Sequence, residues 1–109
     1  MQAFYADDFV LALPEGHRFP MAKYLLLRDA LVAELQAIRL CPAPRASSGE
    51  LALVHDPAYV QAVDEGALEA AILREIGFPW SPQMAERARR SVGATIAAVR
   101  AAQREGVAG

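Results

Sequence analysis

The chain has 109 residues, of which 54% are hydrophobic, and its formal net charge is −2 at neutral pH. This length suffices for one small domain with a modest core, and the apolar content excludes a disordered chain. It also suggests that part of the apolar surface meets a partner. The near-neutral charge gives no general reason to expect nucleic acid or an acidic membrane as that partner.

Cysteine usage and the N-terminal residues indicate a cytoplasmic location. Cys41 is the only cysteine, so neither an internal disulfide nor a thiolate metal cluster can form. The first eight residues lack the basic start and apolar core of a signal peptide. No apolar run approaches the ~20 residues that a membrane-spanning helix needs.

The first half of the chain predicts a βαβ unit over residues 3–54, with parallel strands. Residues 3–11 predict a strand followed by a turn or loop. A helix is expected from about Pro20 to before Cys41, on an apolar stripe formed by Tyr24, Leu27, Leu31, Leu35 and Ile38. The short apolar run 51–54 predicts a buried second strand.

The second half predicts three helices. Asp56 is the expected cap of the first, which breaks at Gly66, and residues 67–76 predict a short one ending at Gly77. The longest should run from the Ser81 cap to Gly106, with small residues that allow close approach to a neighbour, expected to be the sheet. The fold class is therefore α/β but predominantly helical, with two short parallel strands and about four helices in a single domain, residues 1–109.

The loop from Leu13 to Tyr24 is the first candidate site, because it follows a predicted strand and holds His17 beside Arg18. Histidine can serve as a base or ligand, and arginine can hold a carboxylate. The spacing alone favours the alternative, a solvated loop whose side chains bond the backbone.

His55 is the second candidate, because it is expected at the carboxyl end of the second strand; a structural role beside the Asp56 cap is favoured. Two histidines far apart, without a third, do not make a zinc site. The chain also lacks a Gly-x-Ser-x-Gly elbow and a phosphate-binding glycine loop.

Two further groups have both a functional and a structural interpretation. Phe78 and Trp80 could line a substrate groove, but anchoring of their loop on the core is favoured. A cluster of arginines could bind phosphate, but the solvated face of an amphipathic helix is favoured, with Glu86 and Arg90 as an i, i+4 pair. That cluster comprises Arg87, Arg89 and Arg90.

Taken in order, these stretches resemble the N-terminal part of the histone deacetylase superfamily, particularly its bacterial and acetylpolyamine amidohydrolase-like members. The resemblance covers nearly the whole chain. The matching stretches are the Phe4–Tyr5 strand, Pro14–Tyr24, Val54–Val60, Ile76–Ser81 and Ser91–Thr95. Each motif alone is weak, and the ordered set is more specific.

The resemblance implies an arginase-like parallel-sheet fold and zinc-dependent hydrolysis of acetyl-lysine or acetylated amines. The family's zinc ligands, tandem histidines and tyrosine lie downstream, so no catalytic or metal-ligating residue maps onto this chain. What carries over is a pocket wall: Arg18 near the inner end of the pocket, His17 and Phe19 beside it, and Met21 on the inner wall. The rim would lie near Phe78 and Trp80.

The expectation is therefore an N-terminal fragment of a deacetylase domain that is inactive alone. Zinc belongs to the parent family and not to this chain. The alternative is a non-catalytic interaction module of the same ancestry. In either case we expect a homo-oligomer formed through an exposed strand edge or the C-terminal helix. Neither nucleic acid nor a membrane is expected as a partner.

Overall fold

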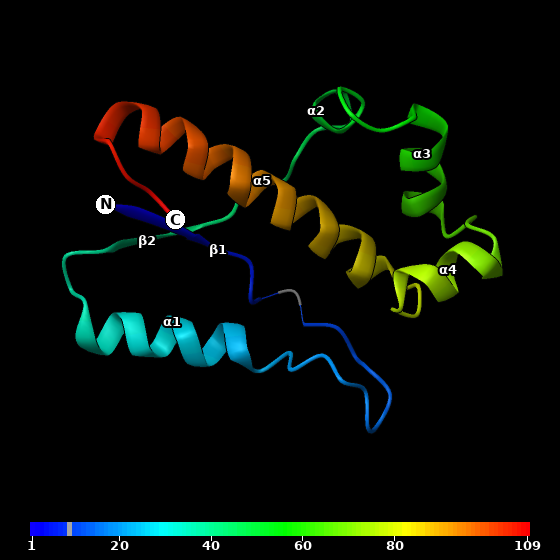
Figure 1. Cartoon of the computed structure of the whole chain (residues 1–109), viewed down its shortest axis with the longest axis horizontal. Helices are drawn as coiled ribbons and strands as arrows, with labels where there is room; N and C mark the ends of the chain where they lie inside the picture. Colours follow the sequence, from blue (N-terminus) through cyan, green and yellow to red (C-terminus); the bar gives the residue numbers. More distant parts are fainter. Residues whose placement is uncertain (9) are drawn as a thin grey trace.

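The computed structural model describes residues 1–8 and 10–109. Within them, two strands and five helices follow one another as shown in Figure 1. The elements are β1 (Gln2–Tyr5), α1 (Lys23–Glu34), β2 (Arg39–Pro42), α2 (Ser48–Leu51), α3 (Pro57–Glu65), α4 (Ala70–Ile76) and α5 (Pro82–Glu105). The mostly helical α/β character and a pair of parallel strands were predicted. Of the five helices, α2 was not predicted.

Strand β1 lies between two parallel neighbours. On one edge it pairs with β2, from Gln2 opposite Arg39 to Tyr5 opposite Pro42. On the other edge, the Phe4 N–H donates to the Gly109 carbonyl at 2.8 Å, and the Gly109 N–H donates to the Gln2 carbonyl at 2.9 Å. The last residues of the chain therefore lie beside its first strand, as Figure 1 shows.

The predicted strand over residues 51–54 is wrong. Ser47 and Glu50 form a capping box: the Glu50 N–H donates to Ser47 Oγ at 3.1 Å, and the Ser47 N–H donates to Glu50 Oε2 at 2.9 Å. This starts α2, which buries Leu51 and leaves Leu53 82% exposed in the following turn. His55 consequently follows a turn and not a strand.

The second strand is instead β2, in a segment that was predicted as the end of a helix and a proline loop. The apolar stripe continues past α1 to Ile38, but the helix ends with Leu35 as its cap. Pro42 closes β2, where its missing N–H is tolerated. The strand predicted at the start of residues 3–11 is β1, and a turn follows it at Asp7 and Asp8. Phe9 in that stretch lies outside the described residues.

Most of the predicted helix boundaries of the second half are confirmed, but α4 begins at Ala70 and not at Ala67. Asp56 Oδ1 accepts from the Ala58 N–H at 2.8 Å and caps α3, and Ser81 Oγ accepts from the Met84 N–H at 3.0 Å and caps α5. Gly66, Gly77 and Gly106 end α3, α4 and α5 in the left-handed conformation.

Helix α5 is the element that joins the two halves of the molecule. It contacts β1 and α3, and it lies against the loop after β2. A small apolar core forms where α5 meets α2 and α3, from Ala46, Leu51, Val60, Val92 and Ile96. At Gly93 the close neighbour is therefore the loop, although the sheet had been expected.

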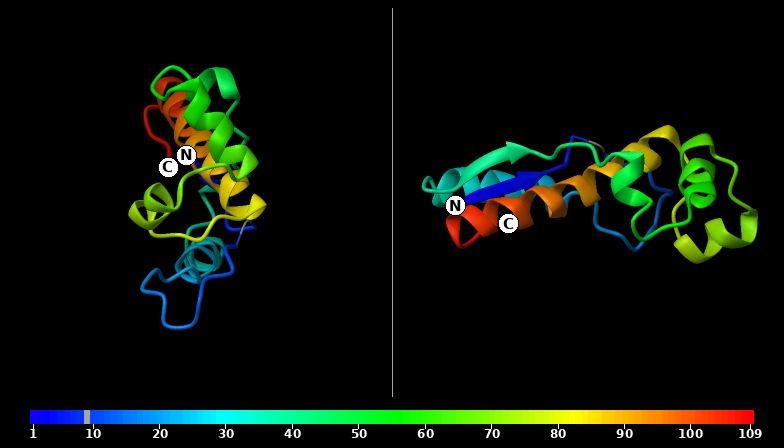
Figure 2. Two further views of the ribbon diagram at one scale, coloured as in Figure 1. Left: turned by 90° about the vertical axis from the view of Figure 1, so that its right-hand side faces the viewer. Right: turned by 90° about the horizontal axis from the view of Figure 1, so that it is seen from above.

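The molecule is thin, with principal extents of 44 × 35 × 17 Å (Figure 2). A core this small leaves much apolar surface exposed. Among the described residues, no helix is long and apolar enough to cross a bilayer.

Candidate functional site

The structure brings two of the predicted stretches together: the loop before α1 and the loop after α4. The His17 ring stacks on Phe78, with ring centroids 5.4 Å apart and an interplanar angle of 20°. Phe19 meets the same ring edge-on at 5.2 Å. Residues 61 and 59 positions apart in sequence thus form one aromatic cluster, which we call the loop junction (His17, Phe19 and Phe78).

Both ring nitrogens of His17 have backbone partners. Nδ1 accepts from the Phe19 N–H at 3.1 Å, which is possible only when Nδ1 carries no proton. Nε2 lies 3.0 Å from the Gly77 carbonyl, which can only accept. These two contacts fit the tautomer that carries its proton on Nε2.

Arg18 lies between the two anchored residues of the loop junction, and its own side chain is exposed. No hydrogen bond or ion pair holds its guanidinium within residues 1–8 and 10–109. Met21 is half-buried, and its N–H donates to the Phe19 carbonyl at 3.0 Å. The backbone around Arg18 is therefore fixed, while its five N–H donors remain available to a ligand.

Two cations border the loop junction, and sequence reasoning did not place them there. Lys23 Nζ lies 4.5 Å from the Phe19 ring centre and 5.0 Å from that of Tyr24. Arg87 approaches the same two rings at 5.8 and 4.9 Å. Arg87 was singled out only as part of a solvated cluster, and no sequence signal connects it to Phe19.

Trp80 and His55 lie apart from this junction. Trp80 Nε1 donates to the Val63 carbonyl at 2.7 Å, and its ring covers Gly66. This agrees with the anchoring interpretation for Trp80, whereas Phe78 lies with the predicted pocket-wall residues. His55 contacts Tyr59, with ring centroids 6.1 Å apart.

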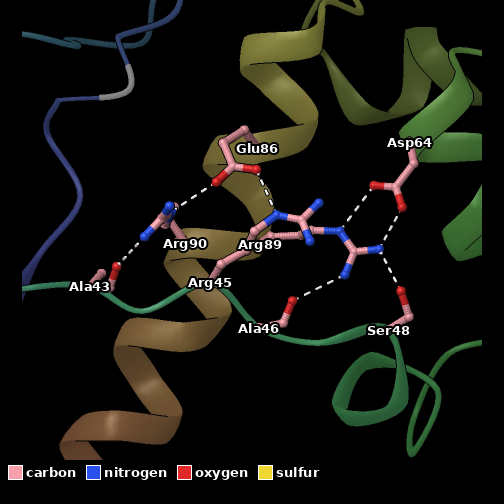
Figure 3. Close-up of polar contacts among 8 residues, drawn as sticks. All are labelled: Ala43, Arg45, Ala46, Ser48, Asp64, Glu86, Arg89 and Arg90. Carbon is pink, nitrogen blue, oxygen red and sulfur yellow. Dashed lines mark hydrogen bonds and ion pairs between the residues drawn. The ribbon is translucent and has the colours of Figure 1, made fainter.

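The arginine cluster is not uniformly solvated, and for Arg89 that interpretation is wrong. Its side chain is 3% exposed and bonds α3 and the segment that leads into α2, as Figure 3 shows. Nε donates to Asp64 Oδ1, Nη1 to the Ala46 carbonyl and Nη2 to Ser48 Oγ, each at 3.0 Å. A buried charge is tolerated when its donors are satisfied in this way.

The neighbouring arginines of Figure 3 fasten the loop after β2 to α5. Glu86 accepts from Arg45 Nε at 2.7 Å and from Arg90 Nε at 2.8 Å; the latter is the predicted i, i+4 pair. Arg90 also donates to the Ala43 carbonyl at 2.9 Å. Hydrogen bonds from Arg45 first, and then from Arg90, hold the pKa of Glu86 below its ordinary value.

Stability should fall in acid because of these carboxylates. The pKa of Asp64 is likewise lowered, chiefly by its hydrogen bond from Arg89. The unfolded chain then binds protons at a higher pH than the native one, so stability is lost as pH falls from about 4 through the native pKa values. Urea midpoints between pH 3 and about pH 7 should show a shallower acid slope in a D64N/E86Q variant. An unchanged slope would contradict this assignment.

An apolar groove of about 700 Å³ separates α1 from β1 and α5. Leu27, Leu31 and Ile38 line one side, and Ala94, Ala98 and Val99 of α5 line the other. Its charged lining residues are Asp7, Arg28 and Arg87. Arg28 Nη1 pairs with Asp7 Oδ2 at 2.9 Å, so α1 is tied to the end of β1 across the groove.

The described residues do not fit a zinc site. No group of three or more histidine, cysteine, aspartate or glutamate side chains in residues 1–8 and 10–109 lies close enough to hold a metal ion. The loop junction can instead present the exposed guanidinium of Arg18 to a ligand. Tyr24, whose ring lies beside Phe19, also lines the apolar groove.

Residues 15–108 match the family model of the histone deacetylase domain. The chain belongs to the histone deacetylase family. The predicted recognition is thereby confirmed, and with it the deacetylase ancestry of these residues.

A relative of this family member occurs in Picosynechococcus sp., where it is named only as an uncharacterized protein. The two are 37% identical over 106 residues, which are 95% of this chain and 35% of the relative. The deacetylase-family chain thus spans about a third of the relative's length.

Proposed function

We propose that these residues form the N-terminal part of a zinc-dependent deacetylase domain, in which the loop from Leu13 to Tyr24 is one wall of the substrate pocket. The family match over residues 15–108 supports this proposal most strongly. The substrate class is acetyl-lysine or acetylated amines, the fold is arginase-like, and the zinc ligands and acid/base histidines come from sequence outside these residues.

Arg18 is the residue of this chain with a direct role in the proposal. The backbone on both sides of it is held by the loop junction, and its exposed guanidinium can take a carboxylate through two parallel N–H···O bonds. Hydrolysis of an acetyl amide releases acetate, which is such a carboxylate. We therefore assign Arg18 to product acetate at the inner end of the pocket, with Met21 beside it.

The first test is the activity of residues 1–109 alone on an acetyl-lysine peptide with added zinc. We expect no turnover above that of a chelator-treated sample, because the described residues offer no metal site. Robust turnover that the chelator abolishes would overturn the claim that the ligands lie elsewhere.

The second test is the coding sequence after Gly109. A tandem His-His within ~10–15 residues, about the length of one long connecting loop, would support the proposal. In a longer gene product with turnover, R18A should lower kcat more than R74A does, since Arg74 is also an exposed arginine. Equal effects would remove the acetate role of Arg18.

A non-catalytic oligomerising module is the second candidate, and the surface of α1 favours it. This helix contains no buried residue, and it exposes leucines and valine on more than one face. Those residues and their exposed fractions are Leu25 46%, Leu26 65%, Leu27 59% and Val32 60%, and the cap Leu35 is 51% exposed. Large apolar side chains exposed together on one helix ordinarily mark a surface that meets another protein.

Light scattering after size exclusion, at protein concentrations about a hundredfold apart, tests the module. We expect an oligomer that an L26Q/V32Q variant dissociates. L53Q is the matched control, because Leu53 is 82% exposed but follows α2 and lies outside α1. A monodisperse monomer at the highest concentration would contradict self-association.

A further inference from the structure

The apolar groove between α1, β1 and α5 carries unmatched positive charge at one tyrosine of its wall. Of the charged side chains in its described lining, Asp7 and Arg28 pair with each other at 2.9 Å, which leaves Arg87. Arg87 is half-buried on α5, and its guanidinium carbon lies 4.9 Å from the Tyr24 ring centre. Lys23 Nζ lies 5.0 Å from the centre of the same ring, so two cations meet there.

Carboxylates close to these two cations in the sequence are bound elsewhere or absent. Glu86, the neighbour of Arg87, accepts from Arg45 and Arg90 instead. Helix α1, which begins at Lys23, has no acidic residue in its first turn. Within the described residues, no hydrogen bond or ion pair joins a carboxylate to Lys23 or Arg87. Two positive charges beside one ring repel each other, and an anion that contacts both would offset that repulsion.

The remaining walls of the groove are mainly apolar. Leu27 and Leu31 of α1 line one side, Ala98 and Val99 of α5 line the other, and the volume is about 700 Å³. Sites for small molecules have volumes of about 300–1,000 Å³. Leu27 and Val99 are 59% and 54% exposed, so a hydrocarbon chain laid between them would bury apolar surface that water now covers.

We propose that the groove binds a long-chain carboxylate, such as a fatty acid, with its head group on Lys23 and Arg87 and its tail between α1 and α5. The two oxygens of a carboxylate can accept from both cations at once, and the tail matches the apolar walls. The described lining does not include Arg18 or Met21, so this site is separate from the proposed pocket wall. Its test therefore does not depend on deacetylation.

Isothermal titration calorimetry of residues 1–109 with myristate tests the site. The titration is made below the micelle concentration at about pH 7.5, where a carboxyl group is ionised. We expect saturable binding of one molecule per chain. Tetradecyltrimethylammonium, which has a tail of the same length but a positive head, should bind at least about tenfold more weakly. Acetate and inorganic phosphate, which have no tail, should show no saturable binding.

Three variants separate the head-group contacts from the tail contacts. R87Q should weaken myristate binding about tenfold, as expected for a lost hydrogen bond between charged groups, whereas R104Q should not. Arg104 is the matched control, because it is an exposed arginine of α5 outside the described lining of the groove. A98L places a larger side chain in the groove and should abolish binding of the tail.

Equal binding of myristate and tetradecyltrimethylammonium would overturn the proposal, and so would uptake of myristate without saturation or equal effects of R87Q and R104Q. A dimer by light scattering that binds no myristate would show that a second copy covers the groove. A longer gene product that binds none would show that its further sequence covers it, and either result overturns the proposal. Circular dichroism identifies a variant that unfolds, and the ligand series on the unmodified chain decides even then.

Discussion

Replacing Arg89 with methionine should lower the free energy of unfolding by about 3 kcal/mol, the low end for a broken buried ion pair. The low end applies because the Asp64 side chain remains 34% exposed and can regain water. The Ala46 carbonyl and Ser48 hydroxyl lose their donors in the same change. Urea unfolding followed by circular dichroism measures the loss.

Arg100→Met is the matched control on the same helix. Arg100 also pairs with an acidic residue, Glu50, at 3.1 Å, but its side chain is 63% exposed. Removal of that exposed pair should cost much less stability than the loss of Arg89. R89K should be almost as damaging as R89M. The planar guanidinium of Arg89 reaches Asp64, Ala46 and Ser48 at once, and the compact ammonium of a lysine cannot. If R89M and R100M lower the free energy of unfolding equally, the buried contacts of Arg89 do not stabilise the fold as proposed.

Replacing Gly93 with alanine should destabilise the chain by about 3 kcal/mol, in the upper range for an overpacked core. A Cβ at this position would lie 1.9 Å from the Pro44 carbonyl oxygen and 3.0 Å from the Ala46 backbone nitrogen. Backbone atoms cannot turn away as a flexible side chain can. The clash therefore outweighs the gain of about 1 kcal/mol that alanine normally brings to a helix interior.

Gly49→Ala is the control, since Gly49 also lies in a helix. The nearest atom to its added Cβ would be Ser47 Oγ at 3.9 Å, an ordinary contact. G49A should therefore be neutral or stabilising by up to about 1 kcal/mol, measured by the same urea unfolding. A stabilising G93A would show that the loop after β2 does not lie against α5 as described.

Local capping chemistry made the second half of the chain predictable. Asp56 and Ser81 each satisfy backbone donors within three residues, and Gly77 and Gly106 adopt a conformation that other residues avoid. Such signals act within one turn, so the sequence alone suffices to find them.

Apolar character alone misplaced the second strand. Leu51 to Val54 looked like a buried strand, but the capping box at Ser47 starts a helix that ends at Leu51, and a turn follows. The true strand, β2, contains Arg39 and Pro42, which disfavour that assignment, and it is selected by pairing with a strand about 37 residues earlier. Neither segment alone contains a signal that predicts its pairing with a distant strand.

The candidate site was predictable as two separate loops but not as one place. Nothing in the spacing of His17 and Phe78 indicates that their rings stack. The burial of Arg89 was equally hidden, because its partners come from two segments far from it in the sequence. A helical arginine beside other arginines looks solvated until the opposing carboxylate is placed.

The position of β1 between two parallel neighbours sets an order of events during synthesis. Gln2 pairs with Arg39 on one edge and bridges to Ala108 on the other, across separations of 37 and 106 residues. The second closure costs about 1 kcal/mol more loop entropy, at roughly 0.6 kcal/mol per doubling of length. The edge of β1 that meets Ala108 therefore stays unpaired until residues 108 and 109 have left the ribosome, a period in which chaperones or neighbouring chains can reach that edge.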